Sequence, residues 1–498
     1  MRRTVSAVMA AVMTVLGAFP AWGGSEAETK SGWQKEEDGW VYLSSDGSRK
    51  TEEWIRGADG ASYYVDENGV MLTNSIVRDN DRIYYVDENG ARVKNRWASE
   101  SNADAEDPCD QDIHTLWYYF GADGRAKRTE GKAVRVKENG VENKYFFDSD
   151  GHMLSGWQRI LNNDGNYDVY YLGDEDDGHA HLRWQYLEPD WDFIDNSKDH
   201  DYDGLEHFYF GWDGKMTKSE ESHLGGNHYV FDENGVMLTG WQPGIELEPG
   251  DDTFGVNKYY DKETGARASG WVYTWDPDDE ENGEPHWYYC DKSDGLIYNE
   301  AGKDGDGGLA YKKIDGQTYF FDENGHMIQG LIATDGTDLG DHLFTESEFE
   351  GLSGTIGAGK GAKPAGIYYL SQDENHLGQM AKDGALKLKD GADSFEYYLS
   401  NCGKAYTNAF IKGHLYGEDG LKIKSDSGND IFEISADIYE KNAFADGVLS
   451  ENYAGKPVIP AGSKVIVNAS GSVKKNGKIK VQGTTYTVKD YVIVSEED

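Results

Sequence analysis

Three stretches of the sequence hold two tryptophans each, and the second tryptophan opens an aromatic triplet (Trp-Val-Tyr or Trp-Tyr-Tyr). The pairs are Trp33 with Trp40, Trp97 with Trp117, and Trp271 with Trp287. Two exposed indoles and a ring from the next segment form a cage that attracts a quaternary ammonium ion through the ring quadrupoles. Rings of this kind also stack on the apolar faces of sugars. Alternatively, the indoles only join neighbouring structural units. Joining is the favoured interpretation for most tryptophans; for these three pairs both interpretations stay open.

A short acidic run has part of the spacing of a metal-binding loop. Asp199, Asp201, Asp203 and Gly204 match the first half of a calcium loop. Such a loop needs a bidentate glutamate at its twelfth position, which here is Phe210. We therefore interpret the run as an acidic hairpin tip and keep calcium at Asp199, Asp201 and Asp203 as the alternative.

No motif in the sequence indicates catalysis or a cofactor. Gly354, Gly359 and Lys360 have the spacing of a phosphate-binding loop, but Gly361 replaces the serine or threonine that would reach magnesium. Carboxylates are so numerous that no pair stands out as acid and base, and no serine lies in a nucleophile elbow. We expect a protein that is not an enzyme and that needs no cofactor.

The elements that must position the tryptophans are repeats. The stretch 228–241 reads HYVFDENGVMLTGW: an aromatic strand, an Asp-Glu-Asn-Gly turn, a short second strand and a Gly-Trp pair. Close copies occupy residues 62–73, 83–93, 144–157 and 318–330, and looser copies occupy 40–47, 117–124, 207–216, 258–265, 287–295 and 396–403. Because Asn-Gly is the strongest short hairpin signal, each unit is predicted to be a β-hairpin. Single hairpins are marginally stable, so we expect them to stack and share a core.

The predicted fold is all-β, an elongated solenoid of stacked β-hairpin repeats with a small C-terminal all-β module. Repeats are expected over 25–330 and 367–428, on either side of a Gly-rich insert or linker at 331–366. The C-terminal module, 429–498, holds seven lysines and no acidic residue between Lys456 and Lys489. Residues 1–24 have the basic start, short apolar run and small-residue cleavage site of a signal peptide.

Charge and cysteine content narrow the class of partner. The formal net charge is −43, with 91 Asp and Glu against 48 Lys and Arg. Such a surface repels nucleic acid and anionic lipid, so neither is an expected partner, and no apolar segment predicts membrane insertion. The three cysteines (Cys109, Cys290 and Cys402) lie far apart and are odd in number. They indicate neither a disulfide framework nor a zinc site, and whether any two are bridged stays open.

The repeats resemble the cell-wall-binding, or choline-binding, repeats of Gram-positive bacteria, and also the repeats of clostridial glucosylating toxins. The resemblance covers about residues 31–425 and implies a β-hairpin solenoid that binds choline on teichoic acid, or carbohydrate. In that family a choline lies between the Gly-Trp indole, the tryptophan of Trp-Tyr-Tyr and an aromatic ring of the following repeat. Transferred to this sequence, the implied sites are Trp33, Trp40 and Tyr64; Trp97, Trp117 and Phe146; and Trp271, Trp287 and Phe320.

The expected function is noncovalent attachment of a secreted, cell-wall-associated protein to teichoic acid or another wall polymer. The competing expectation is a secreted adhesin or toxin-like module that binds host glycans. A third, a wall hydrolase, requires an unrecognised site in the insert or in the C-terminal module.

Overall fold

The computed structural model describes residues 31–102, 113–129, 131–190, 204–243, 257–277, 283–300, 308–345, 356–357 and 362–497. The chain forms two compact units, residues 1–217 and 218–498, which are treated separately below. In both, the described residues form short strands that pair mainly antiparallel, and the expected all-β architecture of stacked hairpins is confirmed. No helix in the described residues is long and apolar enough to cross a membrane.

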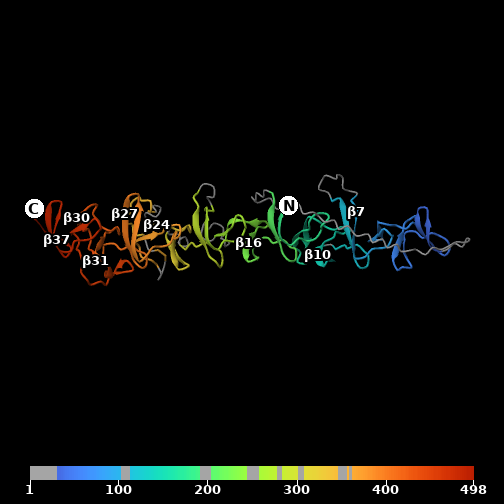
Figure 1. The fold of residues 1–498 in the computed structure, drawn as a ribbon. Coiled ribbons are helices and arrows are strands. Elements are labelled where there is room, and N and C mark those ends of the chain that lie inside the picture. Colours follow the sequence, from blue (N-terminus) through green and yellow to red (C-terminus); the bar gives the residue numbers. More distant parts are fainter. Residues whose placement is uncertain are drawn as a thin grey trace. The chain divides into compact units, whose positions relative to one another are not determined.

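The described residues of unit 1 form seven two-stranded hairpins that follow one another in chain order (Figure 1). Their strands are β1 (Gly32–Glu36), β2 (Gly39–Leu43), β3 (Glu53–Arg56), β4 (Ser62–Val65), β5 (Ser75–Asp79), β6 (Arg82–Val86), β7 (Arg96–Ser101), β8 (Thr115–Phe120), β9 (Val134–Glu138), β10 (Val141–Tyr145), β11 (Trp157–Leu161), β12 (Tyr167–Tyr171), β13 (Arg183–Leu187) and β14 (Glu206–Phe210).

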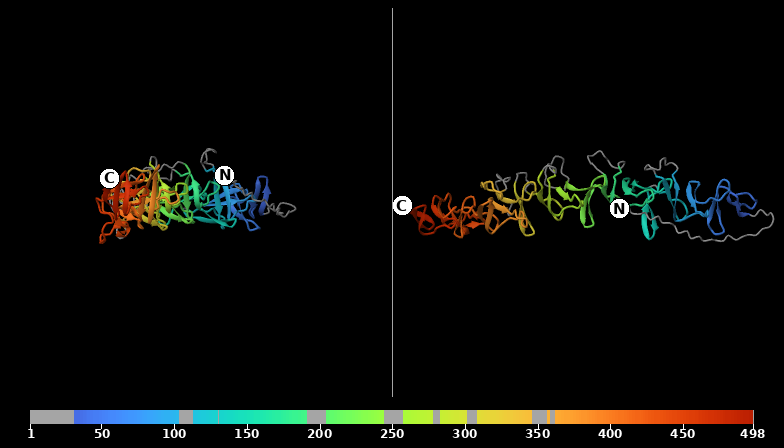
Figure 2. Two further views of the ribbon diagram at one scale, coloured as in Figure 1. Left: turned by 60° about the vertical axis from the view of Figure 1, so that its left-hand side comes forward. Right: turned by 45° about the horizontal axis from the view of Figure 1, so that its top comes forward.

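Unit 2 continues the same plan with hairpins that again follow chain order (Figure 2). Its hairpin strands are β15 (Glu220–Leu224), β16 (Asn227–Phe231), β17 (Met237–Leu238), β18 (Gly240–Pro243), β19 (Asn257–Tyr260), β20 (Gly270–Thr274), β21 (His286–Cys290), β22 (Ala310–Ile314), β23 (Gln317–Phe321), β24 (Gly330–Ala333), β25 (Ile367–Leu370), β26 (Gly384–Asp390), β27 (Asp393–Leu399), β28 (Ala409–Ile411) and β29 (His414–Tyr416). Strand β24 pairs with β25, so the segment between them is a long connection within one hairpin.

The C-terminal residues form a smaller β arrangement that shares its core with the last hairpin. Its elements are β30 (Asn429–Glu433), β31 (Tyr439–Glu440), the 3-10 helix η5 (Lys441–Ala443), β32 (Phe444–Ala445), β33 (Val448–Leu449), β34 (Lys464–Asn468), β35 (Gly477–Val481), β36 (Thr484–Lys489) and β37 (Val492–Glu497). Phe410 and Leu415 of the last hairpin pack with Val465 and Val467 of β34 in one buried cluster.

In several hairpins the turn after the aromatic strand is stabilised by its first residue, an aspartate. In the second hairpin the Asp66 carboxylate accepts hydrogen bonds from the backbone N–H groups of Asn68 (2.9 Å) and Val70 (2.8 Å). Gly69 adopts a φ of +78°, a left-handed conformation that glycine reaches without steric cost. The same Asp-to-N–H bonds recur at Asp87, Asp148 and Asp322. Asp-x-x-Gly therefore closes these four hairpins through local chemistry.

Adjacent hairpins are joined by a recurring backbone hydrogen bond. The residue five places after a turn aspartate donates its N–H to the carbonyl of the residue that opens the aromatic strand of the preceding hairpin. The bonds from Met71 to Trp40, from Arg92 to Ser62, from Met153 to Trp117 and from Met327 to Trp287 each measure 2.8 Å. This bond fixes the register of one hairpin on the next, and it places the two side chains of each pair beside each other.

Strand alternation divides the aromatic residues between two interfaces. Side chains one and three places before the turn point toward the preceding hairpin, whereas those two and four places before it share the face of their own leading tryptophan. The residue directly before the turn is fully buried in most units, for example Val65, Phe120 and Phe321 at 0% exposure. Each hairpin thus buries one face against the hairpin before it and the other against the hairpin after it.

Candidate aromatic binding sites

Each leading tryptophan lies directly across its strand pair from a tyrosine. The register pairs Trp33 with Tyr42, Trp97 with Tyr119, and Trp271 with Tyr289. The ring centroids of these pairs are 5.3, 5.1 and 5.2 Å apart. Because side chains two residues apart share a strand face, the second indoles, Trp40, Trp117 and Trp287, lie on the same faces. The structure therefore brings both expected indoles of each pair to one surface, and Trp271 meets Trp287 edge-on at 6.4 Å.

A third ring comes from the following hairpin, from the residue three places before its turn. Trp33 meets Tyr63 at 5.5 Å, Trp97 meets Tyr145 at 4.9 Å, and Trp271 meets Tyr319 at 4.7 Å. We name the resulting groups by their first tryptophan. They are set 33 (Trp33, Trp40, Tyr42, Tyr63), set 97 (Trp97, Trp117, Tyr119, Tyr145) and set 271 (Trp271, Trp287, Tyr289, Tyr319).

The third rings expected from the family pattern lie one residue away, on the opposite strand face. Tyr64 contacts Trp54 at 5.2 Å, Phe146 contacts Tyr170 at 4.8 Å, and Phe320 contacts Tyr368 at 5.3 Å. The displacement by one residue is the same in all three cases, and it has one physical cause. The residue two places before a turn lies on the opposite strand face from the residue three places before it, so only the latter reaches back to the tryptophan of the preceding hairpin.

Hairpins with a single tryptophan show the same stacking of that tryptophan with two aromatic rings, although they have no second indole. Trp54 lies 5.2 Å from Tyr64 and 5.1 Å from Tyr84 of the next hairpin. Trp157 has the same two neighbours in Tyr171 (5.3 Å) and Phe208 (4.9 Å). Since the geometry does not depend on the second indole, the leading tryptophan and its two rings hold hairpins together. What distinguishes sets 33, 97 and 271 is the second indole.

One single-tryptophan unit carries its own cation. The guanidinium carbon of Arg92 lies 5.2 Å from the Trp54 ring centroid and 5.4 Å from that of Tyr84, within the range of cation–π attraction. The Arg92 Nε atom is buried and has no hydrogen-bond partner. The two aromatic rings are therefore what surrounds this part of the charge. The face between two hairpins can thus hold a cation.

In the three double-indole sets a methionine stands where Arg92 stands. Met71, Met153 and Met327 make the same backbone bond to the carbonyl of the second indole that Arg92 makes to Ser62. Met153 packs with Trp97 and Trp117, and Met327 packs with Trp271 and Trp287. In these sets the neutral methionine therefore takes the place of the Arg92 cation, and the second indole takes the place of Ser62.

Set 97 has the most favourable electrostatics for a cation. The Trp97 indole N–H donates to Glu138 (2.5 Å), and the Tyr145 hydroxyl donates to the other oxygen of the same carboxylate (3.3 Å). Burial raises the pKa of Tyr145 to about 12, and the Glu138 charge adds to the shift. The Trp117 N–H donates to Asp176 at 3.0 Å. In the part of the chain that the structure describes, no lysine or arginine lies over the rings of this set.

The other two sets have a lysine near one ring. In set 271 the Lys312 ammonium lies 5.7 Å from the Tyr289 centroid and 4.6 Å from that of Tyr298. In set 33 the Lys50 ammonium lies 5.9 Å from Tyr42. Among the described residues, set 97 is therefore the double-indole set in which no lysine or arginine of the protein itself lies near the rings and competes with an external cation.

Several sequence predictions fall outside the described residues: the signal peptide, Cys109, the calcium candidates Asp199, Asp201 and Asp203, and most of the phosphate-loop-like segment. Cys290 is buried and free, and Cys402 is free and half-buried. The sequence analysis also missed two groups of histidine and aspartate whose ligand atoms lie within 4.8 Å of one another: Asp177, His179 and His181, and Asp276, His286 and His326. The first had a visible signal, the spacing Asp-x-His-x-His.

Comparisons with known proteins agree on the type of repeat. Residues 50–91 match the family "Choline-binding repeat", and residues 136–153 and 310–327 match the family "Putative cell wall binding repeat". The chain is 28% identical over 247 residues to glucosyltransferase-S of Streptococcus mutans, covering 45% of this chain and 15% of that protein. It is 24% identical over 411 residues to glucosyltransferase-I of Streptococcus downei, covering 81% of this chain and 20% of that protein.

Among solved structures, the chain is similar to the modular autolysin LytC of Streptococcus pneumoniae. The match has 20% identity and a TM-score of 0.32, and it covers 61% of this chain and 55% of the autolysin. The chain thus spans one fifth or less of the two glucosyltransferases and about half of the autolysin.

Proposed function

We propose that this chain, which is built from cell-wall-binding repeats of the choline-binding type, attaches to cell-wall polymer by binding quaternary ammonium groups at its double-indole sets. The observation that carries the proposal is Arg92, whose guanidinium lies over Trp54 and Tyr84 where no second indole is present. The protein's own cation supports the view that this interface attracts positive charge. Where methionine replaces that cation and a second indole is added, the same face can take a cation from outside.

Choline esterified to teichoic acid fits this face because its trimethylammonium group combines positive charge with apolar methyl surface. Each aromatic ring contributes about 0.5–1 kcal/mol when exposed and about 2 kcal/mol when desolvated. A single set therefore binds weakly, and attachment to a polymer arises from several sets acting on one chain. Within this proposal the protein is exported, works without catalysis and resides at the cell wall.

The test is a choline titration of the full protein labelled with 5-fluorotryptophan, which gives each indole its own ¹⁹F signal. Trp117→Ala should remove saturable shifts at Trp97 while leaving those of set 271. The matched control is Trp212→Ala, which removes an indole that is 76% exposed and belongs to no set. The neutral isostere 3,3-dimethylbutanol should bind at least tenfold more weakly than choline. Equal responses to choline and to its neutral isostere contradict a cation site.

Carbohydrate is the second candidate, and exposed rings favour it. Tyr273 is 56% exposed and lies 5.1 Å from Trp287, and Tyr186 is 57% exposed. Rings of this kind stack on sugars, whether of the wall or of a host glycan, and the two curated relatives act on glucosyl groups by name. Binding of glucan or host oligosaccharides that is lost with Tyr273→Ala and kept with Trp117→Ala would favour this candidate over choline.

A further inference from the structure

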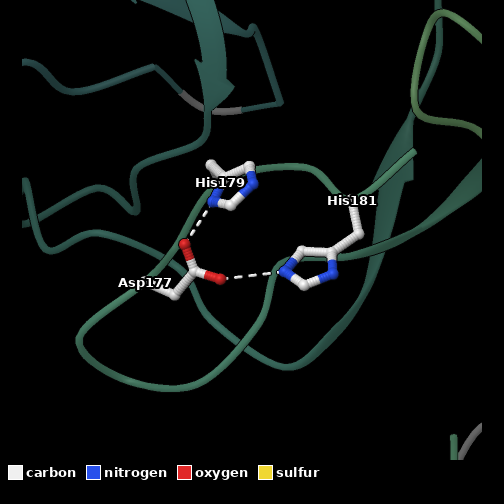
Figure 3. Close-up of side chains that lie close together, drawn as sticks. All are labelled: Asp177, His179 and His181. Carbon is white, nitrogen blue, oxygen red and sulfur yellow. Dashed lines mark hydrogen bonds and ion pairs between the residues drawn. The ribbon is translucent and has the colours of Figure 1, made fainter. Parts of the chain in front are cut away.

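Three side chains in unit 1 converge in the segment between β12 and β13. The Asp177 carboxylate contacts both imidazoles, one through each oxygen (Figure 3). His179 meets it through Nδ1, and His181 meets it through Nε2 at 2.8 Å. The two imidazole rings are stacked, with centroids 4.8 Å apart. None of these residues belongs to an aromatic set.

The local backbone explains why the three groups meet. Ala180, between the two histidines, is buried and donates its N–H to Lys144 of the preceding hairpin at 2.8 Å. Residues on either side of a buried position in extended chain project to the same side, so His179 and His181 face one way. His181 is held further by its N–H bond to the carbonyl of Tyr171 at 2.9 Å. The histidine pair is thus positioned by main-chain bonds that do not involve Asp177.

The acidic turn that supplies Asp177 is held in place by hydrogen bonds of its other carboxylates. Glu175 accepts the backbone N–H of His114 at 2.6 Å, and Asp176 accepts the indole N–H of Trp117 at 3.0 Å. Successive acidic residues therefore have different partners: Glu175 and Asp176 bind the β7–β8 hairpin, and the third, Asp177, faces the histidines. Asp177 is the carboxylate of this turn that is directed at nitrogen ligands.

We propose that Asp177, His179 and His181 form a binding site for a divalent transition-metal ion of the Zn²⁺ class. Two imidazole nitrogens and one carboxylate oxygen are ligands that such ions take, with a fourth position left for water. The three candidate ligand atoms lie within 4.8 Å of one another. A tetrahedral ion with bonds of about 2.0–2.2 Å needs about 3.4 Å between its ligand atoms, so small side-chain rotations are sufficient.

The surroundings of the cluster fit this assignment. His181 turns its other nitrogen, Nδ1, toward the Gln185 side-chain oxygen at 3.4 Å, the outer-sphere contact that orients a metal-bound imidazole. The side chains of Asp177, His179 and His181 are 33%, 34% and 23% exposed, so an ion can enter from solvent. The imidazole nitrogens that face Asp177 would release their protons when a single metal ion binds between them and the carboxylate.

Ordinary histidine–aspartate pairing has a different form in the same unit. The His152 imidazole meets the Asp148 carboxylate through Nδ1 at 2.9 Å, and the backbone N–H of His152 donates to the other oxygen, so one imidazole is bound there among the described residues. In the second histidine group, His326 bonds Asp322 through Nδ1 and Asp276 through Nε2, so both ring nitrogens are engaged by carboxylates. The Asp177 group joins two imidazoles on one carboxylate while leaving the other nitrogen of His181 facing an amide oxygen.

The test is zinc binding by the full protein after chelator treatment, measured in competition with a chromophoric chelator so that weak binding to surface carboxylates does not register. We expect Asp177→Asn and His181→Gln each to remove one tight equivalent or to weaken it at least tenfold. His152→Gln, the matched control, should leave binding unchanged. Aromatic-region circular dichroism of each variant checks that the hairpins remain folded.

A second measurement keeps the proposal testable if those variants unfold. Cobalt added to the unmodified protein should give the intense visible bands of a four-coordinate site, and zinc should abolish them. Gln185→Ala, which leaves all three ligands in place, should weaken zinc several-fold. Absence of those bands, or tight zinc binding that is identical in the unmodified protein, Asp177→Asn and His181→Gln, would overturn the proposal.

Discussion

A single-tryptophan interface should become a cation site when two residues are exchanged together. The second hairpin has Ser62 where sets 33, 97 and 271 have the second indole, and Arg92 where they have methionine. The backbone bond between these two positions measures 2.8 Å, as it does in the three sets. The double variant Ser62→Trp/Arg92→Met therefore rebuilds a double-indole set on an existing frame.

The structure indicates that the exchange leaves stability nearly unchanged. Removing Arg92 loses cation–π attraction to Trp54 and Tyr84, about 1–2 kcal/mol for a partly desolvated charge. It also removes a buried Nε donor that has no hydrogen-bond partner, and an unpaired buried donor costs about 1–3 kcal/mol. These contributions have opposite signs and similar size. The melting temperature of the variant should lie within a few degrees of that of the parent.

The expected gain in binding follows from the rings that the new site would contain. Three or four rings at about 1 kcal/mol each give about 3–4 kcal/mol, which corresponds to a dissociation constant of about 1–5 mM for free choline. Ser62→Trp alone should gain nothing, because Arg92 keeps the place of the cation. Arg92→Met alone lacks one indole and should bind at least fivefold more weakly than the double variant.

The assay is ¹⁹F NMR with 5-fluorotryptophan, in which the indole introduced at position 62 and Trp54 report directly on the new site. Saturable shifts of both signals with choline, and none with 3,3-dimethylbutanol at the same concentration, are expected for the double variant. If Ser62→Trp responds as strongly as the double variant, Arg92 does not occupy the cation position. If the folded double variant shows no response, the second indole is not what makes a set competent.

Three further predictions concern stability. Trp97→Ala should lower the free energy of unfolding of unit 1 by about 2–4 kcal/mol because it empties the centre of a ring stack, whereas Trp117→Ala should cost less than about 2 kcal/mol; urea unfolding measures both. Asp87→Ala removes the carboxylate that accepts two turn N–H groups and should cost about 1–2 kcal/mol, measured in the same way. Burial alone would raise the pKa of Glu221, but the hydrogen bond from Lys258 and the other partners of the carboxylate hold it below 4.5. Its stabilising contribution is therefore present at neutral pH and lost as the pH falls through that lowered pKa. Glu221→Gln should flatten the profile of unfolding free energy against pH in this acidic range, measured by urea unfolding at several pH values.

The hairpins could be predicted because their signal is local. An aspartate that caps its own turn and a glycine with positive φ are contained within four residues, as Asp66 and Gly69 show. The pairing of strands within a hairpin follows the repeated pattern, and Trp97 and Tyr119 pair in that register although an insertion separates their strands. Turn chemistry and repetition of the pattern were therefore enough to predict the all-β repeat fold.

The third ring of each set could not be predicted in the same way, because it depends on the register between hairpins. A shift of one residue moves a side chain to the opposite face of its strand, which is how Tyr145 contacts Trp97 while Phe146 contacts Tyr170. The sequence shows both aromatics side by side and contains no local feature that selects one. The backbone bonds between hairpins make that selection.

We propose that the same register separates the two roles that the tryptophans could have, packing and binding. Packing and binding belong to different residues: the leading indole, such as Trp54 or Trp97, joins hairpins in every such unit, whether or not a second indole is present. At the position bonded to the next hairpin, the second hairpin holds Ser62 beside Arg92, whereas sets 33, 97 and 271 hold tryptophan beside methionine. In the second hairpin the Arg92 guanidinium lies over the rings. In the three sets the methionine is neutral, and set 97 has no lysine or arginine over its rings among the described residues. Whether a hairpin binds an external cation should therefore depend on the residues at the positions that Ser62 and Arg92 occupy in the second hairpin, and not on the number of tryptophans in the hairpin.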